Sequence, residues 1–188
     1  MEQLPVTHAQ QAVGLIMTYR CNLACTYCYI AQKKARDMAL GTAQGILEPL
    51  LKSGGGMLEI MLMGAETLMA YAVIRPLVEW AEALGANRPF HFFGSTNGTL
   101  LTQESKNWFF AHRKSITLGL SYDGLPATQD SNRSGSASDI DLDYFLRTWP
   151  HQRVQMTVDA HSVGSMAQGA IALLAKGFAV NANAAYER

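Results

Sequence analysis

Short β-favouring runs alternate with longer amphipathic segments along the whole of this sequence, and no other feature constrains the fold more. Most of the runs are dense in Val, Ile, Leu, Met and Phe, which is typical of parallel strands covered on both faces. Strands are predicted at Gly14–Thr18, Met57–Met63, Phe90–Thr96, Ile116–Tyr122, Val154–Val158 and Phe178–Ala182. Strands that alternate with helices in this way indicate an α/β fold with a parallel sheet.

The segments between these strands have the composition of helices. They lie near residues 38–52, 71–85, 102–112, 139–148 and 162–175. Gly54 follows the first segment, where glycine readily adopts the left-handed conformation that ends a helix. Thr102 and Ser162 are predicted N-caps. Pro76 fits a first helical turn and suggests that the second helix starts at Arg75.

The chain is too short for a complete eight-unit barrel, which usually needs about 250 residues. With 188 residues, the spacing leaves a partial barrel and an open doubly wound sheet as the two possible architectures. No linker or repeat divides the sequence. We therefore predict a lead-in over residues 1–13 and one core domain over residues 14–188, which a longer protein could extend beyond its C-terminus.

All three cysteines fall within one short segment, where Cys21, Cys25 and Cys28 form a CxxxCxxC motif. The motif follows the first predicted strand, at the end where barrel enzymes place their chemistry. An odd and closely spaced set of cysteines cannot be a disulfide framework and indicates a metal site.

The number of thiolates favours iron and sulfur over zinc. A structural zinc site has four ligands, and no histidine stands at typical zinc spacing from the motif. The histidines are His8, His91, His112, His151 and His161. A [4Fe–4S] cluster with three cysteines keeps one iron open, whereas electron-transfer clusters normally have four cysteine ligands. Zinc and unliganded loop thiols remain alternatives.

Charge and hydropathy argue against some classes of binding partner and favour one cellular compartment. Fifteen basic residues balance fifteen acidic ones, so nucleic acid and anionic membranes are not expected partners. The densest basic cluster, Lys33, Lys34 and Arg36, is short and fits a solvated helix face. The sequence has no apolar run long enough to span a membrane. No basic residue precedes Arg20, whereas a secretory signal starts with a positively charged region. We expect a cytoplasmic protein, where thiols stay reduced.

The CxxxCxxC motif after an N-terminal strand, with Tyr27 before its last cysteine, resembles the radical S-adenosylmethionine (radical SAM) enzymes. The resemblance implies a partial TIM-like barrel, (β/α)6, with parallel strands and helices outside. It implies that Cys21, Cys25 and Cys28 hold a [4Fe–4S] cluster and that Tyr27 contacts the cofactor. In this family the open iron binds S-adenosylmethionine, and an electron from a flavodoxin- or ferredoxin-type donor leads to a 5′-deoxyadenosyl radical that abstracts hydrogen.

The segment after the second predicted strand resembles the family's Gly-Gly-Glu-Pro motif, which holds the amino group of the cofactor's methionine. Gly64, Ala65 and Glu66 stand there, and a carboxylate suits an ammonium group. Ala65 replaces a glycine, which would be strained if its backbone needed positive φ, and Thr67 replaces the proline. Without the cysteines, the same residues fit an ordinary turn with a solvated Glu.

Two further segments resemble the subgroup that modifies peptides and proteins, which includes the anaerobic sulfatase-maturing enzymes. They are Thr-Asn-Gly-Thr-Leu-Leu, which contains Asn97, and Ser-Tyr-Asp-Gly, which begins at Ser121 and is followed by Arg133. The resemblance implies cofactor contacts from these three residues, and Arg133 suits the methionine carboxylate as a charge-assisted fork. Gln129 stands where the subgroup usually has His. Taken alone, the segments fit a tight turn, a turn Asp and a surface Arg.

The substrate implied by this resemblance is a peptide or protein side chain. The subgroup commonly carries a cysteine-rich C-terminal extension, called SPASM, and no cysteine remains here for its clusters. Two alternatives stay open: an enzyme of small-molecule or cofactor biosynthesis, of the molybdenum-cofactor type, and a non-catalytic cluster-binding core fragment. Within the predicted strands, Glu59 is expected to be paired or to line the barrel lumen, and His91 to be a satisfied structural histidine.

Overall fold

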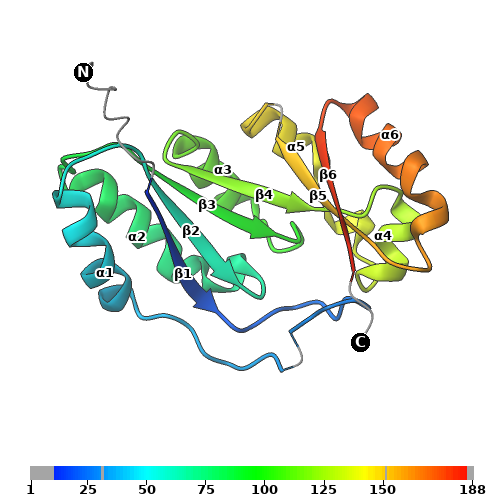
Figure 1. Cartoon of the computed structure of the whole chain (residues 1–188), viewed down its shortest axis with the longest axis horizontal. Coiled ribbons are helices and arrows are strands. Elements are labelled where there is room, and N and C mark those ends of the chain that lie inside the picture. The colour runs from blue at the N-terminus through cyan, green and yellow to red at the C-terminus, as the bar shows by residue number, and fades with distance from the viewer. Residues whose placement is uncertain (1–10, 31, 151, 186–188) are drawn as a thin grey trace, which may run out of the picture.

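The computed structural model describes residues 11–30, 32–150 and 152–185, and one curved parallel sheet forms its centre (Figure 1). The strands are β1 (Gln11–Thr18), β2 (Leu58–Gly64), β3 (Phe90–Thr96), β4 (Ile116–Ser121), β5 (Arg153–Val158) and β6 (Ala179–Ala184). They lie in chain order, each paired in parallel with its sequence neighbour. In the described part of the chain β1 and β6 are the sheet edges, which confirms a partial barrel of six units.

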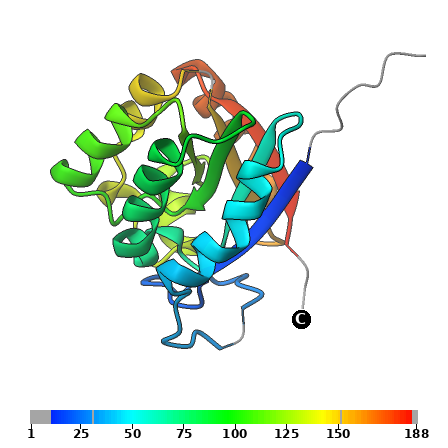
Figure 2. The ribbon, with the colours of Figure 1, turned by 90° about the vertical axis from the view of Figure 1, so that its left-hand side faces the viewer.

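Helices cover one face of the sheet and leave the other face open (Figure 2). The α-helices are α1 (Leu40–Lys52), α2 (Tyr71–Ala83), α3 (Gln103–Ala111), α4 (Pro126–Asn132), α5 (Leu142–Thr148) and α6 (Met166–Lys176). Short 3-10 helices are η1 (Thr67–Ala70), η2 (Ala137–Asp139) and η3 (Val163–Ser165). None of the helices in the described residues has the length and apolar character needed to cross a bilayer.

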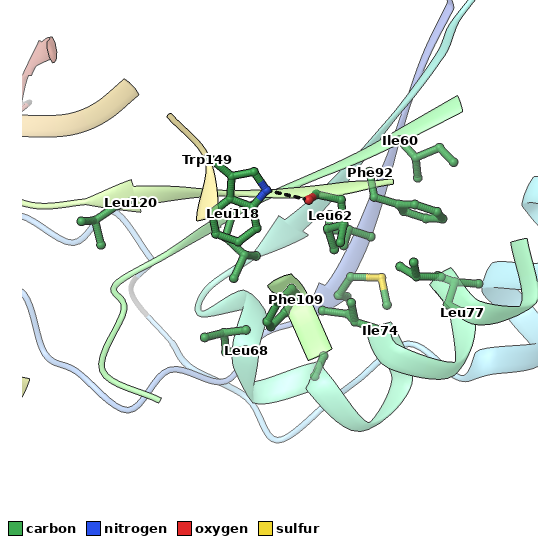
Figure 3. Close-up of a cluster of buried hydrophobic side chains, with 14 of the residues drawn as sticks. Ile60, Leu62, Leu68, Ile74, Leu77, Phe92, Phe109, Leu118, Leu120 and Trp149 are labelled. Carbon is green, nitrogen blue, oxygen red and sulfur yellow. Dashed lines mark hydrogen bonds between the residues drawn. The ribbon is translucent and has the colours of Figure 1, made fainter. Parts of the chain in front are cut away.

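The hydrophobic core lies between the sheet and this helical layer (Figure 3). Alternate strand residues point to the helices, so that Leu62, Phe92 and Leu118 are buried with at most 3% of their surface exposed. The indole N–H of Trp149 donates a 3.0 Å hydrogen bond to the carbonyl of Ile116, which satisfies the polar group of this buried ring. The core thus fixes the strands from the helical side of the sheet. The loops at the carboxyl ends of the strands do not belong to this core and can form a functional site.

Two local signals in the sequence are confirmed. Thr102 caps α3 through a capping box, in which its hydroxyl accepts from the N–H of Ser105 at 3.2 Å and the Ser105 hydroxyl accepts in return. Gly54 follows the end of α1 with φ of 71°, the left-handed conformation expected just after a helix.

Two other local predictions are wrong. Ser162 does not cap α6, because a 3-10 turn comes first and the helix starts at Met166; the Ser162 hydroxyl bonds Asp159 instead. Pro76 lies inside α2 rather than in its first turn, since the helix begins at Tyr71. Proline gives up one helical hydrogen bond there, and the buried residues on either side of it hold the helix to the core.

Two segments differ from the sequence-based boundaries. β1 begins at Gln11, paired with Leu58, so that the predicted lead-in of residues 1–13 contains the start of this strand; its residues 1–10 lie outside the described part. α4 was not predicted, because Pro126–Asn132 has no apolar periodicity and its helical start depends on proline at the first position.

Candidate functional site

One cavity of about 430 Å³ lies among the loops at the carboxyl ends of the strands. The loop after β1 runs along these strand ends and reaches the end of β6 (Figure 1). The cavity is lined by all ten residues that the sequence singled out: Cys21, Cys25, Tyr27, Cys28, Gly64, Ala65, Glu66, Asn97, Ser121 and Arg133. Parallel strands end at one edge of the sheet, which explains how segments so far apart in the sequence meet there.

The cysteine loop is attached to the last residue of α4 and to the segment that follows it. The N–H of Thr26 donates to the carbonyl of Asn132 at 3.0 Å, and the N–H of Ala24 donates to the hydroxyl of Ser134, also at 3.0 Å. Ser134 has φ of 59°, a conformation that residues other than glycine adopt rarely. Hydrogen bonds therefore hold the loop between Cys21 and Cys28 to a second loop, in which Ser134 has an uncommon backbone conformation.

The three thiols share one environment. Burial raises the pKa of Cys25, Arg133 opposes this shift, and the charges of Cys21 and Cys28 act on the same sulfur. Within residues 11–30, 32–150 and 152–185, no three His, Cys, Asp or Glu side chains are gathered closely enough to hold a single metal ion. The donor set nevertheless fits an iron–sulfur cluster, because three sulfur ligands of one loop border one cavity large enough for further atoms.

A zinc site finds no support in the surroundings of these thiols. No histidine is among the described residues that line the cavity. The ring nitrogens of His91 lie 3.2 Å from the Lys114 carbonyl and 3.0 Å from the Thr117 hydroxyl, as expected of a satisfied histidine. His112 is paired with Glu82 on the helical face. His8 and His151 lie outside the described residues.

In the loop after β2, the residue that needs the conformational freedom of glycine is Gly64 and not Ala65. Gly64 has φ of 139°, which glycine tolerates and other residues rarely adopt. Ala65 does not have positive φ, so the strain considered for this substitution is not present. Thr67, which replaces a proline, begins η1 and donates from its hydroxyl to the carbonyl of Leu62 at 3.4 Å. Both departures from the family pattern are compatible with the observed backbone.

Glu66 is a buried anchor with only 2% of its surface exposed. One carboxylate oxygen accepts from the N–H of Leu68 at 2.9 Å and from the hydroxyl of Thr96 at 2.7 Å, and the other accepts from the N–H of Asn97 at 2.8 Å. Burial raises the pKa of Glu66, and these donors oppose the shift. The carboxylate thus ties the loop after β2 to the end of β3, which the turn-and-solvated-Glu interpretation did not foresee.

Asn97 connects the next loop to the cysteine motif. Its amide N–H donates to the side-chain oxygen of Asn22 at 3.0 Å, and its own oxygen accepts from the N–H and hydroxyl of Thr99. Asn22 in turn donates to the Thr99 hydroxyl at 2.8 Å. Asn97 therefore fixes the residue that follows Cys21, in addition to lining the cavity.

Arg133 is a buried residue with a fixed partner, which contradicts the alternative of a surface Arg. Its Nε and Nη2 donate to the two oxygens of Asp123 at 3.0 and 3.1 Å. Tyr27 donates from its hydroxyl to the same carboxylate at 2.5 Å. Burial raises the pKa of Tyr27 well above its usual range, although Arg133 opposes this, so the phenol is protonated and acts as the donor.

The cavity also has lining residues that the sequence did not single out, among them Tyr29, Ser95, Thr157 and Asn183. Ser95 and Asn183 belong to strands β3 and β6, and Thr157 to β5, close to the carboxyl end of each. A systematic reading of polar residues at predicted strand ends would have found them. Asp123 was noted only as part of a turn, because its burial follows from loops that are distant in the sequence.

Two minor expectations change. Glu59 has no ion-pair partner among the described residues, so the expected pairing is not observed; it is half-buried on the open face of the sheet, which agrees with the alternative that it lines the lumen of the partial barrel. Lys33, Lys34 and Arg36 are exposed as expected, but they lie in the irregular segment before α1 and not on a helix.

Comparison with known proteins places this geometry in a family. Residues 15–124 match the family model described as the Radical SAM superfamily. The uncharacterized protein MJ0907 of Methanocaldococcus jannaschii is 31% identical over 111 residues, which are 59% of this chain and 38% of that protein. Among solved structures, anSMEcpe with bound AdoMet and Kp18Cys peptide has a TM-score of 0.82 at 18% identity, over 95% of this chain and 52% of that chain.

A second solved structure is that of Streptococcus suis SuiB, with a TM-score of 0.70 at 16% identity, over 95% of this chain and 40% of SuiB. The chain thus spans about half, or less, of the length of these relatives. At such identities the solved structures show a shared fold, while the family model covers more than half of the chain. On this basis the chain belongs to the radical SAM superfamily of enzymes, whose cofactors are a [4Fe–4S] cluster and S-adenosylmethionine.

Proposed function

We propose that Cys21, Cys25 and Cys28 hold a [4Fe–4S] cluster and that the adjoining cavity binds S-adenosylmethionine. The chemistry supplied by this pair, when bound and reduced, is cleavage of S-adenosylmethionine to methionine and a 5′-deoxyadenosyl radical for hydrogen abstraction. One observation carries the proposal: the three thiols line the same cavity as the glycine–alanine loop after β2 and the buried Arg133.

Several groups of this chain would together bind the polar methionine part of S-adenosylmethionine. Arg133 gives only Nε and Nη2 to Asp123, and its remaining N–H groups suit a carboxylate. The hydroxyl of Ser121 lines the cavity and has no hydrogen-bond partner among the described residues. The backbone at Gly64 and Ala65 offers carbonyl acceptors for an ammonium group. These groups would hold the two charged ends of the methionine part.

Three other lining residues have supporting roles in this proposal. Both oxygens of Glu66 are already bound within the protein, so we assign this residue to the shape of the loop rather than to direct contact. Asn97 holds Asn22 beside the first cysteine. Tyr27 supplies an aromatic wall of the cavity and is fixed through its hydroxyl.

The proposed substrate is a peptide or protein side chain. This is supported by the two subgroup-like segments in the sequence and by neighbours solved with peptides, namely anSMEcpe with Kp18Cys peptide and SuiB with precursor peptide SuiA. Methylornithine synthase (PylB) has the same fold with a TM-score of 0.61 at 9% identity. The fold therefore does not decide between a peptide and a small molecule, and the proposal depends on the loop segments.

Several wider expectations belong to the same proposal. An external donor of the flavodoxin or ferredoxin type would reduce the cluster, and the protein would act in the cytoplasm. Residues 14–188 would form one core domain, joined at its N-terminal side by the first residues of β1. Nucleic acid is not among the proposed partners, because acidic and basic residues are equal in number.

Anaerobic reconstitution tests the cofactors directly. Purified protein is loaded with iron and sulfide, the two are counted, and 5′-deoxyadenosine is assayed after addition of dithionite and S-adenosylmethionine. We expect about four irons per chain, as a [4Fe–4S] centre requires, and cofactor cleavage. Cys21→Ala, Cys25→Ala and Cys28→Ala should each lose the cluster, whereas Thr26→Ala, at an exposed position of the same loop, should keep it.

The possible negative results of this experiment can be told apart. Iron without cleavage would support the alternative of a non-catalytic cluster-binding core fragment. Zinc in place of iron, or four irons retained by a Cys21→Ala/Cys28→Ala variant, would overturn the cluster assignment. Substrate class is then tested with the working enzyme, by comparing 5′-deoxyadenosine formation in the presence of peptides with that in the presence of small molecules.

A further inference from the structure

Asp123 is a fully buried carboxylate at the junction of three loops. Its side chain has 0% exposure. One oxygen accepts from Arg133 Nη2 at 3.1 Å and from the N–H of Thr157 at 2.9 Å. The other accepts from Arg133 Nε at 3.0 Å and from the hydroxyl of Tyr27 at 2.5 Å. A buried carboxylate with this many donors is a strong and specific connection.

Asp123 joins two loops and the end of a strand, all of which border the cavity. Tyr27 lies immediately before Cys28, Arg133 follows α4, and Thr157 is on β5. The Tyr27 ring also lies beneath the Arg133 guanidinium, 5.3 Å from its central carbon to the ring centroid. Tyr27 and Arg133 are therefore held through the same carboxylate and against each other.

The ion pair with Asp123 determines which edge of the Arg133 guanidinium can bind a ligand. Because Nε and Nη2 both face Asp123, the guanidinium plane is fixed and the Nη1 side remains for a ligand in the cavity. Without Asp123 the side chain would keep its charge and lose its orientation, so its contribution to a bound carboxylate would fall.

We propose that Asp123 is a positioning residue that couples the cysteine loop, through Tyr27, to the orientation of Arg133. This inference rests on the proposed function for its effect on the cofactor. The physical link between the loops does not depend on it. A residue with a merely structural role would lower stability alone, whereas a coupling residue makes the effects of Tyr27 and Asp123 on cofactor binding depend on each other.

A double-mutant cycle measures this dependence. Tyr27→Phe removes the hydroxyl alone, and Asp123→Asn keeps the shape while removing the charge. Each variant is reconstituted, its iron is counted, and S-adenosylmethionine affinity is measured together with the electron paramagnetic resonance spectrum of the reduced cluster before and after cofactor addition. Tyr19→Phe and Asp130→Asn are matched controls, because both positions are exposed and lie outside the cavity lining.

We expect Asp123→Asn to weaken cofactor affinity by about tenfold or more, as for loss of a charge-assisted hydrogen bond, and to alter the cofactor-induced spectral change. Tyr27→Phe should weaken affinity by a smaller factor. Added to Asp123→Asn, it should cause little further loss, because the carboxylate through which the Tyr27 hydroxyl acts on Arg133 has already been replaced by an amide. Losses that multiply as independent factors, or a variant that lowers thermal stability without changing affinity or spectrum, would overturn the coupling.

A second measurement needs neither cluster nor cofactor. Hydrogen exchange of the full chain, before reconstitution, should become about tenfold faster over residues 19–30 in both Tyr27→Phe and Asp123→Asn, with Tyr19→Phe unchanged. Unchanged exchange would refute the link between the loops. If exchange responds but wild-type protein takes up no iron, the proposed function fails and the coupling to a cofactor fails with it, while the loop connection stands.

Discussion

Gly64 passes so close to Thr18 that no side chain fits between them. A Cβ built at position 64 would lie 2.2 Å from the carbonyl oxygen of Thr18 and 3.1 Å from its nitrogen. The next residue, Ala65, donates its N–H to that same carbonyl at 3.0 Å. The loop after β2 is thereby seated on the end of β1, directly before the cysteine loop, and this contact requires glycine at position 64 alone.

Gly64→Ala should therefore damage both fold and site. The substitution combines a backbone clash with φ of 139°, and such a conformation alone costs about 1–3 kcal/mol. We expect the free energy of unfolding, measured in urea, to fall by about 3 kcal/mol or more. Since the loop must move away from Thr18, S-adenosylmethionine affinity should fall as well.

Ala65→Gly is the matched variant at the neighbouring position. Ala65 lies outside the positive-φ region, so the glycine relieves no strain and lowers stability by less than about 1 kcal/mol through chain entropy. A marked gain in stability or in cofactor affinity from Ala65→Gly would contradict the finding that alanine is tolerated here.

Glu66→Gln should loosen the connection between the loop after β2 and the end of β3. All of the groups that contact the carboxylate are donors, and an amide would point its own N–H at one of them. An unsatisfied buried donor costs about 1–3 kcal/mol, and we expect a loss of that size in urea unfolding. Glu59→Gln, at a half-buried position on the open face, should change stability little; equal losses in both variants would refute the anchoring role.

Gly169→Ala should push α6 away from the turn that carries Asp123. A Cβ at position 169 would lie 3.0 Å from the Cα of Gly124, which has φ of 90°, so two backbones are in contact here. Because a backbone cannot yield as a flexible side chain does, we expect a loss of about 1–3 kcal/mol. Gly164→Ala is the control, since nothing lies within 4 Å of its added methyl. The contact is unimportant if thermal unfolding shows no difference between the two.

The sequence predicted most of what depends on periodicity and on local motifs. The strands were located because dense apolar runs mark buried parallel strands, and the parallel arrangement brought the residues of the motifs to one edge. The N-cap at Thr102 could be predicted because a cap is a local feature; the structure adds that Ser105, three residues later, completes a capping box.

The sequence failed where a residue's environment is made by distant segments. The local sequence around Asp123 and Arg133 also fits a turn Asp and a surface Arg, and it does not reveal that the two form a buried pair, because the cysteine loop and β5 cover them. Glu66 was considered as a cofactor contact, and its donors come from β3 and η1. α4 has no apolar periodicity to reveal it. Such features follow from tertiary contacts and not from spacing.

The ion pair between Lys106 and Asp141 should give the protein a small pH-dependent stability. Lys106 Nζ lies 2.8 Å from Asp141, which also caps α5 by accepting from the N–H of Tyr144 at 2.9 Å. The hydrogen bond from Lys106 lowers the pKa of Asp141. A folded pKa below the unfolded value, about 3.9, means that the stabilisation is present above that pH and is lost as the pH falls through the folded pKa.

Asp141→Asn isolates this contribution, because asparagine caps a helix about as well as aspartate while carrying no charge. At pH 7 the variant should unfold in urea with a free energy lower by up to about 1 kcal/mol, the usual limit for a partly exposed pair. The difference should begin to shrink as the pH falls below about 3.9 and should vanish once the pH is below the lowered pKa of Asp141 in the folded protein. Asp143→Asn, exposed on the same helix, should show no such convergence. A difference for Asp141→Asn that stayed constant from pH 7 to pH 3 would mean that lost capping, and not the ion pair, is the cause.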